Sequence, residues 1–124
     1  MFQFISAVGA PHPLPVGSRE WRACTDVIQL IAREKHISVR LLINRSRCRA
    51  NAARARQLAM YLSHVVLGVS LTDVGRAFGR DRTTVAYACA VIEDMRDDRA
   101  FDDDVTALER LIESQQDGEP GHDH

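Results

Sequence analysis

Apolar side chains recur at steps of three and four residues along most of this chain, which is the period of an α-helix that buries one face. Trp21, Cys24, Ile28 and Ile31 form one such stripe, and similar stripes follow as far as Ile112. No segment alternates apolar and polar residues in the way that a half-buried strand requires. The sequence therefore predicts an all-α fold of about five to six helices.

The 124 residues divide into three parts at changes in composition, and their length suits a single domain. Residues 1–17 contain three closely spaced prolines, which lack amide donors and interrupt helices, so we expect a flexible N-terminal arm. Residues 18–96 hold most of the helical stripes and are predicted to form the folded domain. Residues 97–124 begin with a run of aspartates, and we expect an acidic linker, a short amphipathic helix and a disordered tail.

Capping residues locate the ends of the predicted helices. Ser18, Ser38 and Ser70 each precede a helical stripe and are predicted N-caps. A longer helix is predicted over residues 51–67, with Gly68 as its C-terminal stop. In the last segment Asp102 is expected to cap a helix with one apolar side, formed by Val105, Leu108, Leu111 and Ile112.

Residues 70–92 carry the spacing of a helix-turn-helix. Gly79 is placed to make the turn, Gly75 is small enough to let the second helix approach the first, and Val85 would anchor the second helix in the core. Asp81 is its predicted N-cap. The exposed start of this helix would suit a DNA major groove, because Arg donates twice to guanine and Thr offers a hydroxyl and a methyl group; its residues are Arg82, Thr83 and Thr84.

The net charge of −1 conceals two parts of opposite sign. Residues 1–92 hold 13 Lys or Arg and 5 Asp or Glu, whereas residues 93–124 hold 3 and 12. From Lys35 to Thr72 there are seven basic residues and no acidic one. A long stretch without carboxylates is typical of a phosphate-contacting surface, so the pattern favours a nucleic-acid partner.

The sequence lacks the features of several other function classes. The histidines and cysteines do not form metal-ligand spacings, and we predict no metal, no nucleotide cofactor and no enzymatic activity. No stretch approaches the roughly 18 apolar residues that span a bilayer, so no membrane partner is predicted. The absence of a secretory signal favours the cytoplasm, at the nucleoid. Tyr61 and Tyr87 lie at helical spacing and are interpreted as packing residues rather than as base-stacking groups.

Three segments together resemble a known family. Residues 79–85, Gly-Arg-Asp-Arg-Thr-Thr-Val, are similar to the Gly-Gly-Arg-Asp-His-Thr-Thr-Val signature of the C-terminal DNA-binding domain of the bacterial replication initiator DnaA. Residues 54–60 resemble its Arg-x-Arg-Gln-x-Ala-Met helix, and residues 70–78 its Ser-Leu-x-x-Ile-Gly-x-x-Phe segment. The order is collinear over roughly residues 24–94. One glycine of the family's pair is absent before Arg80, and Arg82 stands where the family has histidine.

The resemblance implies a Trp-repressor-like helix-turn-helix domain that binds an AT-rich double-stranded nonamer as a monomer. The major groove would receive the start of the second helix, namely Asp81, Arg82, Thr83 and Thr84. An arginine of the preceding basic loop would enter the adjacent minor groove, where a narrow AT tract concentrates negative potential; the candidates are Arg45, Arg47 and Arg49. Phosphates would be held by Arg54, Arg56, Gln57 and Arg80.

The family normally joins this domain to an ATPase module, but the phosphate-binding loop of that module is absent and Lys35 is the only lysine. We therefore expect a stand-alone DNA-binding domain. Such a domain would occupy initiator-type boxes and regulate replication initiation or transcription. The alternative is an adaptor that binds a replication initiator or its regulators through the last amphipathic helix instead of binding DNA. The acidic C-terminal part, which opposes DNA, motivates this alternative.

Overall fold

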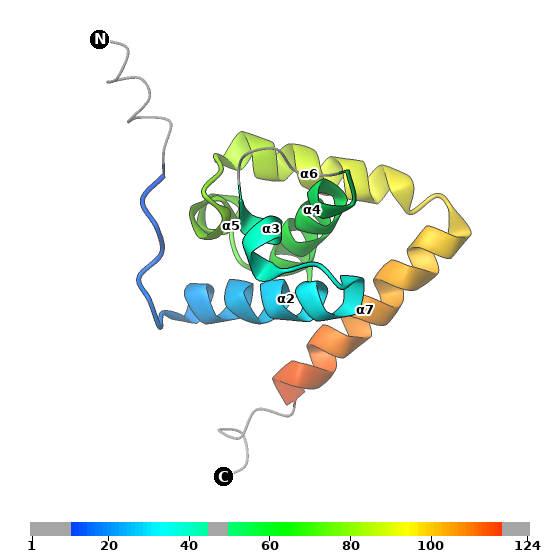
Figure 1. The fold of residues 1–124 in the computed structure, drawn as a ribbon, viewed down its shortest axis with the longest axis horizontal. Helices are drawn as coiled ribbons and strands as arrows, with labels where there is room; N and C mark the ends of the chain where they lie inside the picture. Colours follow the sequence, from blue (N-terminus) through cyan, green and yellow to red (C-terminus); the bar gives the residue numbers. More distant parts are fainter. Residues whose placement is uncertain (1–10, 45–49, 118–124) are drawn as a thin grey trace.

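The computed structural model describes residues 11–44 and 50–117, and within those residues it contains six helices and no strand. Figure 1 shows α2 along one edge and α6 along the opposite edge, with α4 between them and α7 crossing near the end of α2. The all-α prediction is confirmed. In chain order the helices are α2 (Arg19–Lys35), α3 (Val39–Ile43), α4 (Ala50–Val65), α5 (Leu71–Phe78), α6 (Arg82–Met95) and α7 (Arg99–Asp117).

Serine side chains begin the first two helices, as predicted. Ser18 Oγ accepts a hydrogen bond from the Trp21 amide at 3.2 Å, and Ser38 Oγ accepts one from the Leu41 amide at 3.1 Å. These bonds satisfy amide donors that have no partner inside the helix. The end of α4 is also close to the prediction, since Gly68 follows it with a φ of +71°.

The core forms around α4, whose small residues let its neighbours approach. Ala52, Ala55 and Ala59 are at most 4% exposed, and α2 and α6 pack on either side of this helix. Each large apolar side chain removed from water contributes about 1.5–3 kcal/mol. The largest buried side chains come from all six helices, and they include Leu30, Ile31, Leu42, Leu58, Leu62, Val74, Ile92 and Ile112.

The described part of the N-terminal segment is held against the domain, which corrects the expectation of a free arm over residues 11–17. Leu14 is only 6% exposed. The Arg76 guanidinium of α5 donates to the carbonyl oxygens of His12 at 3.0 Å and Pro13 at 3.3 Å. The segment is non-helical, as its prolines require, but it is anchored by one apolar side chain and two backbone acceptors. Residues 1–10 lie outside the described residues.

Helix α7 corrects the predicted acidic linker and short helix. It begins at Arg99, directly after Asp98, whose Oδ2 accepts a hydrogen bond from the Phe101 amide at 2.9 Å. Its apolar side belongs to the same buried cluster as the rest of the domain, through Val105, Leu108 and Ile112. The core therefore extends beyond the boundary predicted at residue 96.

Arg96 joins α7 to α4 at the corner where α6 ends. Its guanidinium donates to Glu109 Oε2 at 2.8 Å, to the Tyr61 hydroxyl at 3.0 Å and to Thr106 Oγ1 at 3.1 Å, and it also pairs with Asp102. The hydrogen bond to Glu109 is the main cause that raises the pKa of Arg96 above its ordinary value. Burial raises the pKa of Tyr61, against the opposing effect of Arg96.

Candidate nucleic-acid interface

The turn between α5 and α6 is built as the sequence predicts. Gly79 ends α5 with a φ of +69°, a conformation that glycine adopts without steric cost. The Arg80 amide donates to the Gly75 carbonyl at 2.9 Å, and a Cβ atom on Gly75 would lie 2.4 Å from the Arg80 carbonyl oxygen. Val85 is fully buried. Gly75 therefore permits a backbone contact between α5 and the turn that a residue with a Cβ atom would obstruct.

Asp81 caps α6, and the three residues after it are exposed. Its Oδ1 accepts a hydrogen bond from the Thr84 amide at 2.8 Å. Hydrogen bonds from Thr84, and a weaker one from the Thr83 backbone, lower the pKa of Asp81 below its ordinary value. The predicted cap is confirmed. Arg82, Thr83 and Thr84 thus stand at the exposed beginning of a well-defined helix, with side chains that can hydrogen bond to a ligand.

Two of the predicted phosphate-binding arginines are turned toward the protein itself. Arg56 is only 8% exposed, and its Nε donates to the Leu42 carbonyl at 2.7 Å. One of its terminal nitrogens donates to the carbonyls of Leu41 at 3.2 Å and Asn44 at 3.0 Å. These acceptors are the last carbonyls of α3 and its C-cap, which have no partners within the helix. Arg56 therefore stabilises the end of α3.

Arg80 approaches the same place from the turn before α6. Its guanidinium donates to the carbonyls of Phe78 at 2.7 Å, Ile43 at 3.1 Å and Asn44 at 3.2 Å. The turn of the helix-turn-helix is thereby connected to the end of α3. The residues that follow Asn44 are the predicted minor-groove arginines, and Arg45, Arg47 and Arg49 all lie outside the described residues.

Arg54 and Gln57 have a different environment from Arg56, although all three belong to α4. Arg54 is exposed, and it donates to Gln57 Oε1 at 2.6 Å. This bond lies on the surface of the helix. Both polar groups therefore remain accessible to a ligand, whereas Arg56 on the neighbouring side of the helix is enclosed.

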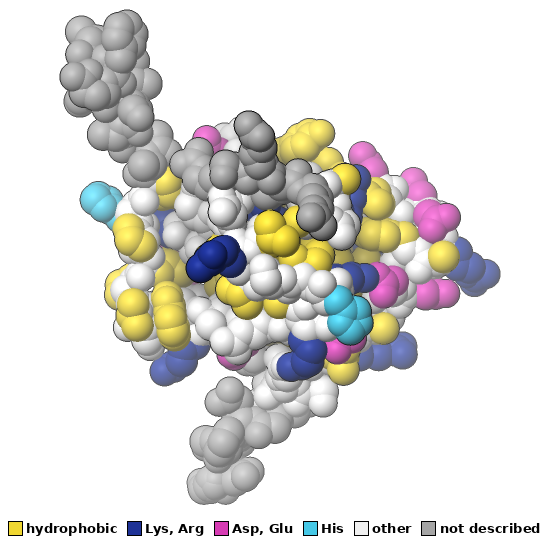
Figure 2. All heavy atoms as spheres, in the orientation of Figure 1, with side chains coloured by type: hydrophobic (Ala, Val, Ile, Leu, Met, Phe, Trp, Pro, Cys, Tyr) yellow, Lys and Arg dark blue, Asp and Glu magenta, His cyan; other side chains and the backbone are white. Residues whose placement is uncertain are grey.

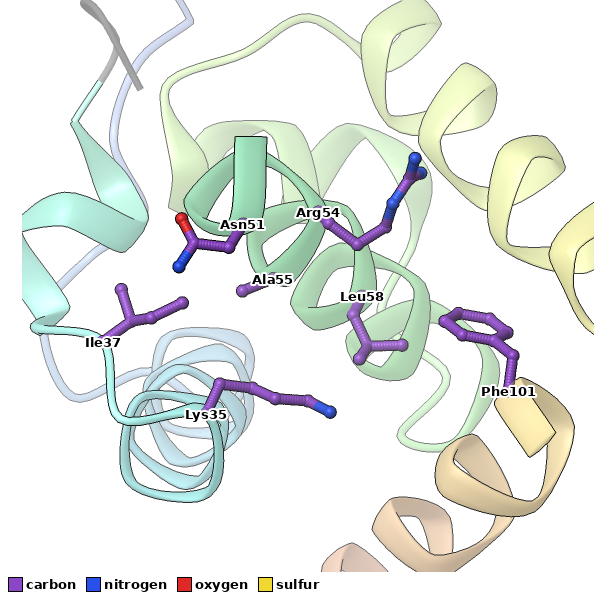
Figure 3. A pocket seen from close by; sticks show the side chains of 7 residues that line it. All are labelled: Lys35, Ile37, Asn51, Arg54, Ala55, Leu58 and Phe101. Carbon is purple, nitrogen blue, oxygen red and sulfur yellow. The ribbon is translucent and has the colours of Figure 1, made fainter. Parts of the chain in front are cut away.

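A hollow of about 210 Å³ lies beside Arg54, between α2, α4 and α7 (Figure 3). The Arg54 side chain points away from Lys35 and Ile37, which lie on the other side of this hollow. Lys35 Nζ is itself paired with Asp104 at 2.7 Å. The walls are mainly apolar, and the lining residues are Lys35, Ile37, Asn51, Arg54, Ala55, Leu58 and Phe101.

Sequence reasoning missed the exposure of Tyr87 on α6. Helical spacing predicts a packing role for both tyrosines, but the Tyr87 side chain is 66% exposed, whereas Tyr61 is buried. The helical period could have predicted this exposure, because Val85, Ala88 and Ile92 are buried and Tyr87 lies on the opposite side of α6. Tyr87 therefore shares the exposed side of α6 with Thr83.

Charge is separated along α6. Arg82 lies at its first turn, while carboxylates gather over the corner where α6 ends and α7 begins, as Figure 2 shows. The exposed members of this acidic corner are Glu93, Asp94, Asp97, Asp98, Asp103 and Asp104. A polyanion is therefore favoured at the beginning of α6 and repelled from its end.

No group of three or more His, Cys, Asp or Glu side chains that could hold a metal ion occurs in residues 11–44 and 50–117. None of the helices in that part of the chain is long and apolar enough to cross a membrane. The stripe suggested for an adaptor is largely buried, since Val105, Leu108 and Ile112 are at most 3% exposed and only Leu111 remains at the surface.

Comparisons with known proteins agree with this architecture. The profile of the bacterial DnaA helix-turn-helix matches residues 24–92. The chain is 40% identical over 90 residues to the chromosomal replication initiator protein DnaA of Rhodopseudomonas palustris strain BisA53, and 39% identical over 92 residues to that of Mesorhizobium japonicum. These matches cover 71% and 73% of this chain and 19% of each relative.

A solved structure shares both the fold and part of the sequence. It is the crystal structure of a DNA replication initiation factor, which matches with a TM-score of 0.72 and 29% identity, over 77% of this chain and 30% of that one. The helix-turn-helix geometry, the matched profile and these relatives lead to one conclusion. The chain belongs to the bacterial DnaA helix-turn-helix family.

Proposed function

We propose that this chain binds double-stranded DNA sequence-specifically, at an AT-rich box of the initiator type, and thereby regulates replication initiation or transcription. The observation that carries this proposal is the capped, exposed start of α6 behind a rigid turn. Arg82, Thr83 and Thr84 would contact base edges in the major groove. Family membership supports the choice of DNA as the partner, and chromosomal DNA as partner would place the chain at the nucleoid.

The exposed basic groups are assigned to the DNA backbone and the minor groove. Arg54 and Gln57 would bind phosphates from the surface of α4. One of Arg45, Arg47 and Arg49 would enter the minor groove next to the site read by α6. Phosphate contacts fix position, while base contacts fix sequence, so the two groups have separable effects on binding.

Arg56 and Arg80 are assigned a supporting role in place of the phosphate contacts expected from the family resemblance. Their guanidinium groups donate to backbone carbonyls at the end of α3. Before it could reach a phosphate, Arg56 would have to break a buried hydrogen bond, and Arg80 would have to release three backbone carbonyls at more exposed positions. We therefore propose that both residues position the basic loop relative to α6.

Charge separation along α6 suggests how the helix would dock. Its beginning carries Arg82 and its end lies at the acidic corner, so the beginning would enter the groove while the end points away from the phosphates. This is also the usual orientation of a recognition helix, whose first residues contact base edges.

Paired variants test the assignment of roles. Binding of the full chain to a duplex with the initiator-type nonamer and to a scrambled duplex is measured by fluorescence anisotropy. Arg82→Ala should reduce the preference for the nonamer by about tenfold or more. Arg54→Ala should weaken both duplexes alike and lower the salt slope by about one. If the two variants have the same effect on the preference, the proposed division of roles is wrong.

A further inference from the structure

Tyr87 is the one exposed aromatic side chain in the described part of the chain, and its exposure is not explained by the fold. Its ring is 66% exposed on α6, although burying such a ring would stabilise the domain. Within residues 11–44 and 50–117 it makes no hydrogen bond or ring contact. The side chain is therefore available to a partner.

The position of Tyr87 on α6 aligns it with the proposed recognition residues. At 100° per residue, positions 83 and 87 differ by about 40° around the helix and by about 6 Å along it. Ala86 and Ala90 are also exposed on this side of α6, and Val85, Ala88 and Ile92 are buried on the other side. Thr83 and Tyr87 thus form a row along the exposed side, bordered by small residues that permit close approach to a ligand surface.

The chemistry of this row limits what it can recognise. Ala86 and Ala90 have no side-chain hydrogen-bonding group, so between the first turn of α6 and the carboxylates of Glu93 and Asp94 the phenol hydroxyl is the only polar side-chain group on this side of the helix. In the major groove the apolar feature that distinguishes one base from the others is the C5-methyl group of thymine. The ring of Tyr87 lies one helical turn after Thr83, and from there it can contact such a methyl group at a base pair next to those that face the first turn of α6.

We propose that Tyr87 is a specificity-determining DNA contact whose ring packs against a thymine methyl group. This inference rests on the proposed function, because it assumes that α6 enters the major groove of an AT-rich site. It adds a residue that the family signature around Asp81 does not include. It also predicts that the second turn of α6 contributes to the choice of site.

The test removes the ring and the methyl group separately. The full chain, Tyr87→Phe, Tyr87→Ala and the control Leu111→Ala, which shortens an exposed apolar side chain on α7, are titrated against the nonamer duplex and the scrambled duplex. A set of nonamer duplexes replaces each thymine in turn by deoxyuridine, which lacks the methyl group. Circular dichroism checks that each variant is folded, and alanine should preserve α6 because of its high helix propensity.

The expected pattern is specific to a methyl contact. Tyr87→Ala should weaken binding to the nonamer about tenfold and leave the scrambled duplex unchanged. Tyr87→Phe and Leu111→Ala should bind like the unmodified chain. At one thymine, replacement by deoxyuridine should weaken binding by the unmodified chain and by Tyr87→Phe, but should have no further effect on Tyr87→Ala.

Other outcomes separate this inference from the proposed function. Equal weakening on both duplexes, shared by Tyr87→Phe, would mean that the hydroxyl binds a phosphate, and it would overturn the methyl contact. A Tyr87→Ala variant that keeps the full preference for the nonamer would overturn the inference and leave the proposed function intact. An unmodified chain without any preference would overturn the proposed function itself.

Discussion

Arg56 and Arg80 donate to the same carbonyl oxygen, that of Asn44, at 3.0 Å and 3.2 Å. The first belongs to α4 and the second to the turn before α6, so this oxygen connects three parts of the domain. Both guanidinium groups also donate to other carbonyls at the ends of neighbouring helices. A charged donor that satisfies several carbonyls in a partly enclosed place is costly to remove, because each acceptor then loses its partner.

Arg56→Met should lower the free energy of unfolding by about 2–4 kcal/mol, because one buried and two partly buried hydrogen bonds to carbonyls at the end of α3 lose their charged donor. Arg54→Met, two positions away on α4, should change it by less than about 1 kcal/mol, because Arg54 is exposed. Urea denaturation measures both values. Equal losses would show that Arg56 does not have the supporting role. Arg56→Lys keeps a charged donor group, so its loss of stability should fall between those of Arg56→Met and Arg54→Met.

Gly75→Ala should destabilise the domain by about 2 kcal/mol, because the new Cβ would lie 2.4 Å from the Arg80 carbonyl oxygen. Helix propensity alone predicts the opposite sign, since alanine is about 1 kcal/mol better than glycine inside a helix. Thermal or urea denaturation gives the change in the free energy of unfolding. Its sign shows whether the clash with the Arg80 carbonyl outweighs the gain in helix propensity. A stabilised variant would mean that the backbone contact between α5 and the turn is not needed.

Asp81 should make the stability of α6 depend on pH in the acid range. The pKa of this carboxyl is lowered in the folded state by hydrogen bonds from Thr84 and Thr83, so its contribution is present above the unfolded pKa and is lost as pH falls through the folded pKa. Stability should therefore decline below about pH 4. Asp81→Asn, which can still cap a helix, should have a shallower decline; an identical decline in both proteins would assign the effect to other carboxylates.

Arg96→Met should loosen α7 by breaking the bonds to Glu109, Asp102, Tyr61 and Thr106. We expect a loss of about 2 kcal/mol in the free energy of unfolding, together with faster amide hydrogen exchange in α7. Arg110→Met provides the control, because Arg110 is an exposed arginine of α7. Unchanged exchange in α7 would contradict the role given to Arg96.

The local features of the fold were predictable because their causes are local. Serine and aspartate caps act on amides three residues away, and Ser18, Ser38 and Asp81 are found in that role. The spacing of Gly75, Gly79 and Val85 is typical of a helix-turn-helix, and it placed α5 and α6 correctly. Helical periodicity likewise identified the fold class.

The errors came from interactions between distant parts of the chain. An arginine that binds backbone carbonyls has the same sequence appearance as one that binds phosphates, so Arg56 could not be told from Arg54. The run of aspartates suggested a solvated linker, whereas Asp102 belongs to the continuous helix α7 and pairs with Arg96 at the end of α6. Leu14 likewise gave no sign of its burial. The exposure of Tyr87, in contrast, follows from the phase of α6 and was open to prediction.

The most direct test of the central claim compares binding of the full chain to the nonamer duplex and to the scrambled duplex by fluorescence anisotropy at several salt concentrations. We predict a preference for the nonamer of more than about a hundredfold, because specific complexes commonly exceed non-specific ones by at least that factor. If about five phosphates are contacted, the logarithm of affinity should fall with the logarithm of salt concentration with a slope of about −4 to −5. Weak and equal binding to both duplexes would contradict sequence-specific recognition by α6.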